Sequence, residues 1–320
     1  VLLGYTLELD TNFSSLINIY LQIIIMKNLT YILLTITIFS CLKMDDLPFL
    51  GEELTEYKFE NYEGENGNDE LPSSYLIPDS NINVITLNSK LTGENDGETI
   101  YAVYVGNMNT ISTDTVIVYC HGQSKHMDAY WPRAKLLANV GGKNRYGVLM
   151  MDYRGYGLSS GKSTEASLYQ DVRVCLDWLD NKGVASQEVI MYGFSLGTIP
   201  AIDLSAFYGT AAPNKLILEA PMASVENLTE ESLLIDVSST FFTSLKFDNV
   251  EKIKSVTQPL MWIHGVDDDY LSISNGEAIY ERHGGTYKEA HRIAGANHGD
   301  VPTVMGFDTY CKKILKFITR

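Results

Sequence analysis

The sequence predicts an α/β fold with a mostly parallel central sheet and helices on both faces. From about residue 81 onward, apolar runs of strand length alternate with segments of helical periodicity, which is the order of βαβ units. Several of these runs are apolar at nearly every position, as expected of strands buried on both faces. In addition, the run at 188–192 stops at a Gly-Phe-Ser-Leu-Gly turn and is followed by a helical stretch.

The elements follow one another in a regular order. Before the turn we expect a strand pair at 84–87 and 99–105 joined by a hairpin at 93–97, buried strands at 115–120 and 147–151, a helix between them and a helix at 168–179. After it we expect strands at 215–218, 259–263 and 287–293, with helices at 274–281 and 307–318.

Four polar residues fall within five residues after the ends of predicted strands. They are His121, Ser195, Asp268 and His298. In open sheets of parallel strands, ligands bind at the carboxyl ends of the strands. The sequence therefore predicts a site at this edge of the sheet.

The turn at 193–197 is the strongest candidate for a nucleophile. Gly-x-Ser-x-Gly between a strand and a helix lifts the serine hydroxyl clear of the sheet. The helix that follows points its free N–H groups at any oxyanion formed on Ser195.

A serine nucleophile needs a base and an orienting acid. His298, in a Gly-rich loop after the last strand, is the best base. His121 and His264 each precede a glycine at a strand end, and we expect them to shape those loops. Glu219, also at a strand end, is an alternative acid to Asp268.

The region 81–320 resembles the α/β-hydrolase family, and in particular its serine-aminopeptidase-like branch. The resemblance is carried by five motifs in family order: His121-Gly122-Gln123, the stretch 152–159 (Asp-Tyr-Arg-Gly-Tyr-Gly-Leu-Ser), the turn at 193–197, the stretch 264–268 (His-Gly-Val-Asp-Asp) and Asn297-His298-Gly299.

The resemblance implies roles for particular residues. Asp268 would be the acid of a Ser195–Asp268–His298 triad, and the backbone N–H groups of Gln123 and Leu196 would form the oxyanion hole. Tyr156 would border the pocket. Apart from the resemblance, His121 at its strand end is a further candidate for the pocket.

The activity implied is that of a serine hydrolase. It would cleave an ester, a thioester or a short peptide or amide bond of a small acyl substrate through an acyl-enzyme intermediate. The insertion between the strand ending at Glu219 and the acid-bearing strand is short for a specificity-determining cap. The sequence therefore does not choose among ester, thioester and peptide substrates. The alternative is a surface-anchored binding protein on a hydrolase fold with little turnover. We expect no cofactor and no metal, since no His/Cys cluster has metal-ligand spacing.

Charge argues against a nucleic-acid partner. The net charge of the 320 residues is −16, whereas phosphate binding needs a basic face. Residues 41–80 hold eleven Asp and Glu against two Lys, and we interpret them as an acidic flexible linker.

The N-terminal region predicts export. Met26-Lys27 is a short basic start, residues 29–39 are apolar with the length of a signal peptide, and Ser40-Cys41 resembles a bacterial lipoprotein processing site. We expect residues 1–40 to be a leader, with the part before Met26 outside the native signal. A lipid on Cys41 would anchor the protein to a membrane of the cell envelope. A periplasmic or secreted form and an uncleaved anchor are the alternatives. The other cysteines (Cys120, Cys175 and Cys311) are expected to be buried free thiols.

Overall fold

The computed structural model describes residues 20, 22, 24–27, 49–63, 71–227 and 243–320. The chain divides into two compact units, residues 46–237 with 245–320 and residues 1–45 with 238–244. In the smaller unit, residues 24–27 are helical and exposed. Within the described ranges, no helix is both long and apolar enough to cross a membrane.

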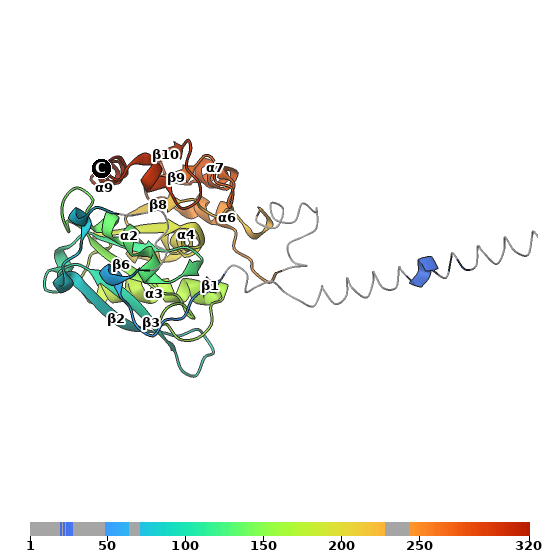
Figure 1. The fold of residues 1–320 in the computed structure, drawn as a ribbon, viewed down its shortest axis with the longest axis horizontal. Helices are drawn as coiled ribbons and strands as arrows, with labels where there is room; N and C mark the ends of the chain where they lie inside the picture. The colour runs from blue at the N-terminus through green and yellow to red at the C-terminus, as the bar shows by residue number, and fades with distance from the viewer. Residues whose placement is uncertain (1–19, 21, 23, 28–48, 64–70, 228–242) are drawn as a thin grey trace, which may run out of the picture. The chain divides into compact units, whose positions relative to one another are not determined.

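The larger unit is built on one eight-stranded sheet (Figure 1). Its strands are ordered β10-β9-β8-β7-β4-β6-β3-β2. β3 pairs antiparallel with both β2 and β6, and all other neighbours are parallel. The bounds are β2 Ile82–Ser89, β3 Glu98–Val105, β4 Val116–Cys120, β6 Gly147–Met151, β7 Val189–Phe194, β8 Lys215–Glu219, β9 Leu260–Gly265 and β10 Lys288–Ile293.

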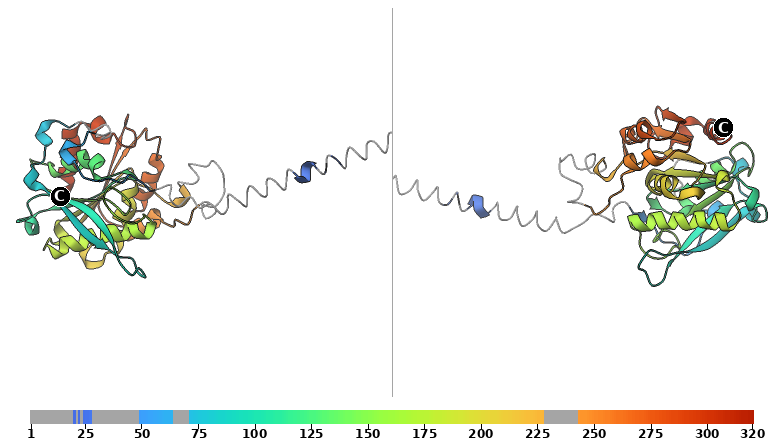
Figure 2. Two further views of the ribbon diagram at one scale, coloured as in Figure 1. Left: turned by 60° about the horizontal axis from the view of Figure 1, so that its bottom comes forward. Right: turned by 180° about the vertical axis from the view of Figure 1, so that it is seen from behind.

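Helices cover both faces of this sheet (Figure 2). One face packs against α3, α4, α6 and α7, and the other packs against α2 and α9. The helices are α2 Met127–Ala138, α3 Glu165–Asn181, α4 Thr198–Phe207, α6 Asn249–Lys252, α7 Ile273–Arg282, α8 Val301–Met305 and α9 Phe307–Ile318. The predicted mostly parallel α/β architecture is confirmed.

The two cores follow from the alternation of side chains along each strand. In β4, Val116, Val118 and Cys120 face the core under α3 and α4, whereas Ile117 and Tyr119 face the core under α2 and α9. Every one of these five side chains is at most 1% exposed. This burial on both faces explains why the strand is a continuous apolar run in the sequence.

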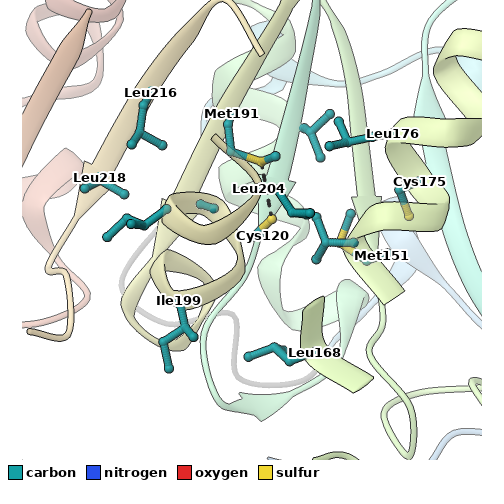
Figure 3. Close-up of a cluster of buried hydrophobic side chains, with 14 of the residues drawn as sticks. Cys120, Met151, Leu168, Cys175, Leu176, Met191, Ile199, Leu204, Leu216 and Leu218 are labelled. Carbon is teal, nitrogen blue, oxygen red and sulfur yellow. Dashed lines mark hydrogen bonds between the residues drawn. The ribbon is translucent and has the colours of Figure 1, made fainter. Parts of the chain in front are cut away.

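The three expected thiols are buried and free. Figure 3 shows Cys120 and Cys175 in the core under α3 and α4, where Cys120 Sγ lies 3.7 Å from Met191 Sδ. Burial raises the pKa of the Cys120 thiol well above its ordinary value. Cys41 lies outside the described residues.

Residues 49–63, which the sequence assigns to a linker, pack against the sheet-bearing unit. We call them the N-terminal strap. β1 (Leu50–Gly51) pairs parallel with β5 (Ser124–Lys125), and Phe59 is 9% exposed with its ring 4.7 Å from that of Trp131. The side chain of Asp128 accepts hydrogen bonds from the backbone N–H groups of Lys58 and Phe59. The acidic composition of this segment does not predict its packing. The strap is held in place by one buried ring and by backbone hydrogen bonds, which depend little on composition.

Candidate active site

The serine turn lies between β7 and α4, as predicted. Ser195 has φ 51°, a left-handed conformation that a residue with a side chain adopts at a cost. A Cβ on Gly197 would lie 2.0 Å from the carbonyl oxygen of Cys120, and one on Gly193 would lie 2.7 Å from Cα of Thr198. The turn therefore needs glycine at both positions to pass this close to β4 and α4.

The structure brings the three predicted catalytic side chains into one hydrogen-bonded row. His298 Nε2 lies 2.9 Å from Ser195 Oγ, and His298 Nδ1 lies 2.8 Å from Asp268 Oδ2. The three residues come from the ends of β7, β9 and β10. A base that contacts the nucleophile and is oriented by an acid is the arrangement that activates a serine.

The carboxylate of Asp268 is held from several sides. Its Oδ1 accepts hydrogen bonds from the N–H groups of Tyr270 (3.1 Å) and Leu271 (2.8 Å), and its Oδ2 faces the rings of His298 and His264. Burial on its own would raise the pKa of Asp268. The hydrogen bonds from His264 and His298 outweigh burial and hold the pKa well below its ordinary value.

The low pKa of Asp268 predicts a pH-dependent stability. An unfolded Asp titrates near pH 4, so the ionised native carboxylate stabilises the fold above that pH and loses this contribution below it. We expect the difference in free energy of unfolding between the wild type and Asp268→Asn to be roughly 1 kcal/mol smaller at pH 3 than at pH 5. Urea unfolding at both pH values measures it. A difference that stays constant would contradict an ionised Asp268.

The neighbouring carboxylates have other partners. Asp267 Oδ2 accepts a hydrogen bond from the N–H of Gly295 (2.8 Å), and the backbone N–H of Asp269 donates to Asn297 (3.1 Å). Both side chains are exposed, whereas Asp268 is 9% exposed. Of the three, Asp268 is the one in contact with His298.

Glu219, the alternative acid, belongs to a separate buried cluster. Its Oε2 lies 2.5 Å from Arg133 Nη1 and accepts hydrogen bonds from the hydroxyls of Tyr192 and, at 3.0 Å, Tyr310. Arg133 in turn donates to the carbonyl of Gly299, beside His298. Glu219 therefore bonds to a residue that supports the His298 loop, and its Oε2 is engaged by three donors.

We expect Glu219→Gln to affect stability far more than catalysis. Removing the negative charge beside a buried guanidinium should lower the free energy of unfolding by roughly 3 kcal/mol. At temperatures where the variant is folded, kcat should stay within about tenfold of the wild type. Thermal unfolding and steady-state rates check both parts. A severe loss of kcat with an unchanged Tm would make Glu219 the acid in place of Asp268.

The two expected oxyanion donors flank Ser195. Leu196 lies in the turn itself, and Gln123 lies in the loop at the end of β4, residues 121–125, which we call the oxyanion loop. The carbonyl of Gln123 accepts hydrogen bonds from the backbone N–H of Leu50 (2.9 Å) and the hydroxyl of Tyr156 (2.6 Å). The strap thus holds the loop in place, a contact that the sequence analysis missed.

His121 supports the oxyanion loop and does not line the pocket. Its ring is fully buried, with Nδ1 2.8 Å from the carbonyl of Gly122 and Nε2 3.2 Å from Asp152 Oδ1. The ring also stacks on Tyr130 at 4.6 Å. Tyr156 is 1% exposed and lies behind the same loop. We expected His121 and Tyr156 to line the pocket. Both instead lie in the wall behind it.

A cavity of about 230 Å³ opens at Ser195. The loop between β9 and α7, residues 266–272, carries Asp268, and we call it the acid loop. The hydroxyl of Tyr270 accepts a hydrogen bond from the side-chain amide of Gln123, so the acid loop and the oxyanion loop meet across the cavity. The ring of Tyr270 lies 4.9 Å from that of His298. Tyr270 was not among the residues predicted for the site, although it is an aromatic residue only two positions after Asp268. The cavity is lined by Gly122, Gln123, Ser124, Tyr130, Phe194, Ser195, Tyr270 and His298.

Among the residues that the structure describes, no group of three or more His, Cys, Asp or Glu side chains could hold a metal ion. The residues that line the cavity with Ser195 are a histidine, three aromatic residues, a glutamine, a serine and a glycine. What they can supply is proton transfer and hydrogen bonding to a developing oxyanion.

Comparison with known proteins places the chain among hydrolases. The family described as "Serine aminopeptidase, S33" matches residues 111–258. Alpha/beta hydrolase domain-containing protein 17B of Homo sapiens is 30% identical over 207 residues, which are 64% of this chain and 66% of the relative. The protein of the same name from Xenopus laevis is 30% identical over 210 residues, 65% of this chain and 68% of the relative. The matched part of this chain thus corresponds to about two thirds of the length of each of these relatives.

Solved structures share the fold at low sequence identity. The esterase Pf2001 of Pyrococcus furiosus superimposes with a TM-score of 0.60 at 17% identity, covering 76% of this chain and 91% of that one. The esterase RhEst1 of Rhodococcus sp. gives a TM-score of 0.56 at 19% identity, covering 74% and 98%. With the sheet order, the serine turn and the relatives above, these findings show that the chain belongs to the α/β-hydrolase family.

Proposed function

We propose that this chain is a serine hydrolase that cleaves an ester, a thioester or a short amide through an acyl-enzyme intermediate. The observation that carries the proposal is the continuous row from Ser195 Oγ through His298 to Asp268, with links of 2.9 Å and 2.8 Å, at the floor of a cavity. The esterase names of the fold neighbours support the same class of reaction.

The first half of the reaction forms the acyl-enzyme. His298 Nε2 takes the proton of Ser195 Oγ while that oxygen attacks the substrate carbonyl carbon. The N–H groups of Gln123 and Leu196 stabilise the tetrahedral oxyanion, each contributing about 3 kcal/mol. As the intermediate collapses, His298 passes its proton to the leaving oxygen, sulfur or nitrogen. In the second half, His298 takes a proton from water while the water oxygen attacks the acyl carbon. The bond from that carbon to Ser195 Oγ then breaks as His298 returns the proton to Oγ, which releases the acid and restores the serine.

The cavity favours a modest acyl group. About 230 Å³ is bounded by the rings of Tyr130, Phe194 and Tyr270, which offer an apolar surface. We therefore propose acyl esters with short to medium chains as the first substrates to test.

Fluorophosphonate labelling and a panel of p-nitrophenyl acyl esters, acyl thioesters and aminoacyl amides test this function. We expect labelling of one serine and turnover of at least one ester. The alternative, a binding protein on a hydrolase fold, requires neither. Absence of both labelling and turnover in folded protein would overturn the proposal.

We also propose that the protein is exported and anchored by lipid on Cys41, which lies outside the described residues. The basic start, the apolar stretch 29–39 and Ser40-Cys41 support it. Expression in a Gram-negative host with radiolabelled palmitate should label the wild type, and Cys41→Ala should remove the label. An unlabelled wild type would contradict lipidation.

A further inference from the structure

A second histidine contacts the carboxylate of Asp268. His264, in β9, is fully buried, and its Nε2 lies 3.2 Å from Asp268 Oδ2 and 3.0 Å from the carbonyl of Leu271. The reaction described above uses only His298. His264 is therefore a buried, titratable side chain in contact with the candidate acid and without a role.

The partner of its other nitrogen fixes where its proton lies. The indole N–H of Trp262 can only donate, and Trp262 Nε1 lies 3.4 Å from His264 Nδ1. His264 Nδ1 is thus the acceptor, and the ring carries its proton on Nε2. Because residues two apart share a face of a strand, β9 itself places this indole beside His264. The ring is neutral and donates Nε2–H toward Asp268 and Leu271.

The same carboxylate oxygen then faces two N–H groups. Asp268 Oδ2 lies 2.8 Å from His298 Nδ1 and 3.2 Å from His264 Nε2, while Oδ1 accepts two backbone N–H groups. With a donor at His264 and two on the opposite oxygen, the carboxylate cannot rotate away from His298 without losing hydrogen bonds. The Trp262 indole is fixed in turn, since a Cβ on Gly276 of α7 would lie 2.3 Å from its Nε1.

We infer that His264 is a positioning residue: its neutral imidazole donates Nε2–H to Asp268 and aims the shared carboxylate oxygen at His298. The inference rests on the proposed function for its kinetic consequence, but the contact itself is independent of turnover.

The other charged groups near this contact either pair with one another or are exposed to solvent. Glu277 of α7 pairs with Arg292 of β10 at 2.5 Å, and that guanidinium lies 4.8 Å from the Trp262 ring. Asp267 and Asp269 are exposed on the acid loop, and Tyr270 covers His298. The buried contacts of Asp268 Oδ2 are the two histidines.

The kinetics of two variants distinguish a His264 that donates a hydrogen bond from a His264 that only fills space. His264→Gln places an amide N–H near the position of Nε2, whereas His264→Leu fills the space without a donor. We expect His264→Leu to lower kcat by about 10- to 100-fold with KM within about threefold, and His264→Gln to recover most of kcat. His283→Leu, which removes another buried histidine, should leave kcat unchanged.

A double-mutant cycle tests whether the effect passes through Asp268. In the Asp268→Asn background, His264→Leu should cost little more, because the carboxylate that it positions is gone. Equal fold-losses in both backgrounds, or wild-type kcat in His264→Leu, would overturn the inference while leaving the serine-hydrolase proposal standing.

Nitrogen-15 NMR of the histidine rings tests the hydrogen bond from His264 to Asp268 without requiring any catalytic activity. We expect His264 as the neutral Nε2–H tautomer near pH 7. The His298 Nδ1–H resonance should also move in His264→Leu and return in His264→Gln. An Nδ1–H tautomer or an imidazolium at His264 would overturn the inference. If the protein neither labels nor turns over, the proposed function fails, and these spectra still decide the inference.

Discussion

Replacing Ser195 with alanine is expected to leave a folded protein with almost no hydrolytic activity. Because we propose this hydroxyl, at the start of the row to His298, as the nucleophile, its loss should lower kcat by roughly 10⁴- to 10⁶-fold. Steady-state rates on the best ester, together with loss of fluorophosphonate labelling, measure the effect.

Alanine suits this position as a test because the strain of the turn is in the backbone, with φ 51°, and not in the hydroxyl. Circular dichroism and Tm should therefore stay close to the wild type. Ser205→Ala, at another buried serine on α4, is the matched control and should keep full activity. Turnover near the wild-type rate in Ser195→Ala would remove the serine-hydrolase mechanism altogether.

The second large effect is expected at Asp268. Asp268→Asn keeps the shape of the side chain but removes the charge beside His298, which in the proposed mechanism orients the ring and stabilises its imidazolium. Comparable changes lower kcat by about 10⁴-fold. Steady-state kinetics at saturating substrate should show the loss in kcat, since Asp268 does not line the cavity.

The adjacent carboxylates provide internal controls for this change. An asparagine at 267 keeps an oxygen that can accept the Gly295 N–H, and the side chain of Asp269 is exposed. Asp267→Asn and Asp269→Asn should each lower kcat by less than about tenfold. A severe loss in Asp267→Asn with a mild one in Asp268→Asn would move the acid to the neighbouring position and leave Ser195 and His298 in place.

Local patterns explain which parts of this molecule the sequence predicts. The strands of the sheet are continuous apolar runs because both their faces are buried, and β4 shows this at every position. The serine turn is equally local, since Gly-x-Ser-x-Gly between a strand and a helix is a short pattern that can be recognised in the sequence. The placement of His298 and Asp268 follows from strand order, because parallel strands end at one edge.

Contacts between residues far apart in the chain could not be predicted from the sequence. Glu219 ends a strand just as a catalytic acid would, and only the approach of Arg133 from α2 and Tyr310 from α9 assigns its carboxylate elsewhere. His264 has the local sequence of a loop-shaping residue. Its contact with Asp268 depends on how the loop after β9 turns back over the strand end.

The N-terminal strap bears on how short this chain could be made. A protein beginning at residue 81 would retain every residue of the Ser195–His298–Asp268 row, yet it would lack the Leu50 N–H that fixes the carbonyl of Gln123. It would also expose the Trp131 ring that Phe59 covers and remove the Tyr57 hydroxyl from Asp152. We therefore expect a stable shortened chain to need the strap, which starts about thirty residues before the first strand of the large sheet, in a segment whose sequence resembles a spacer.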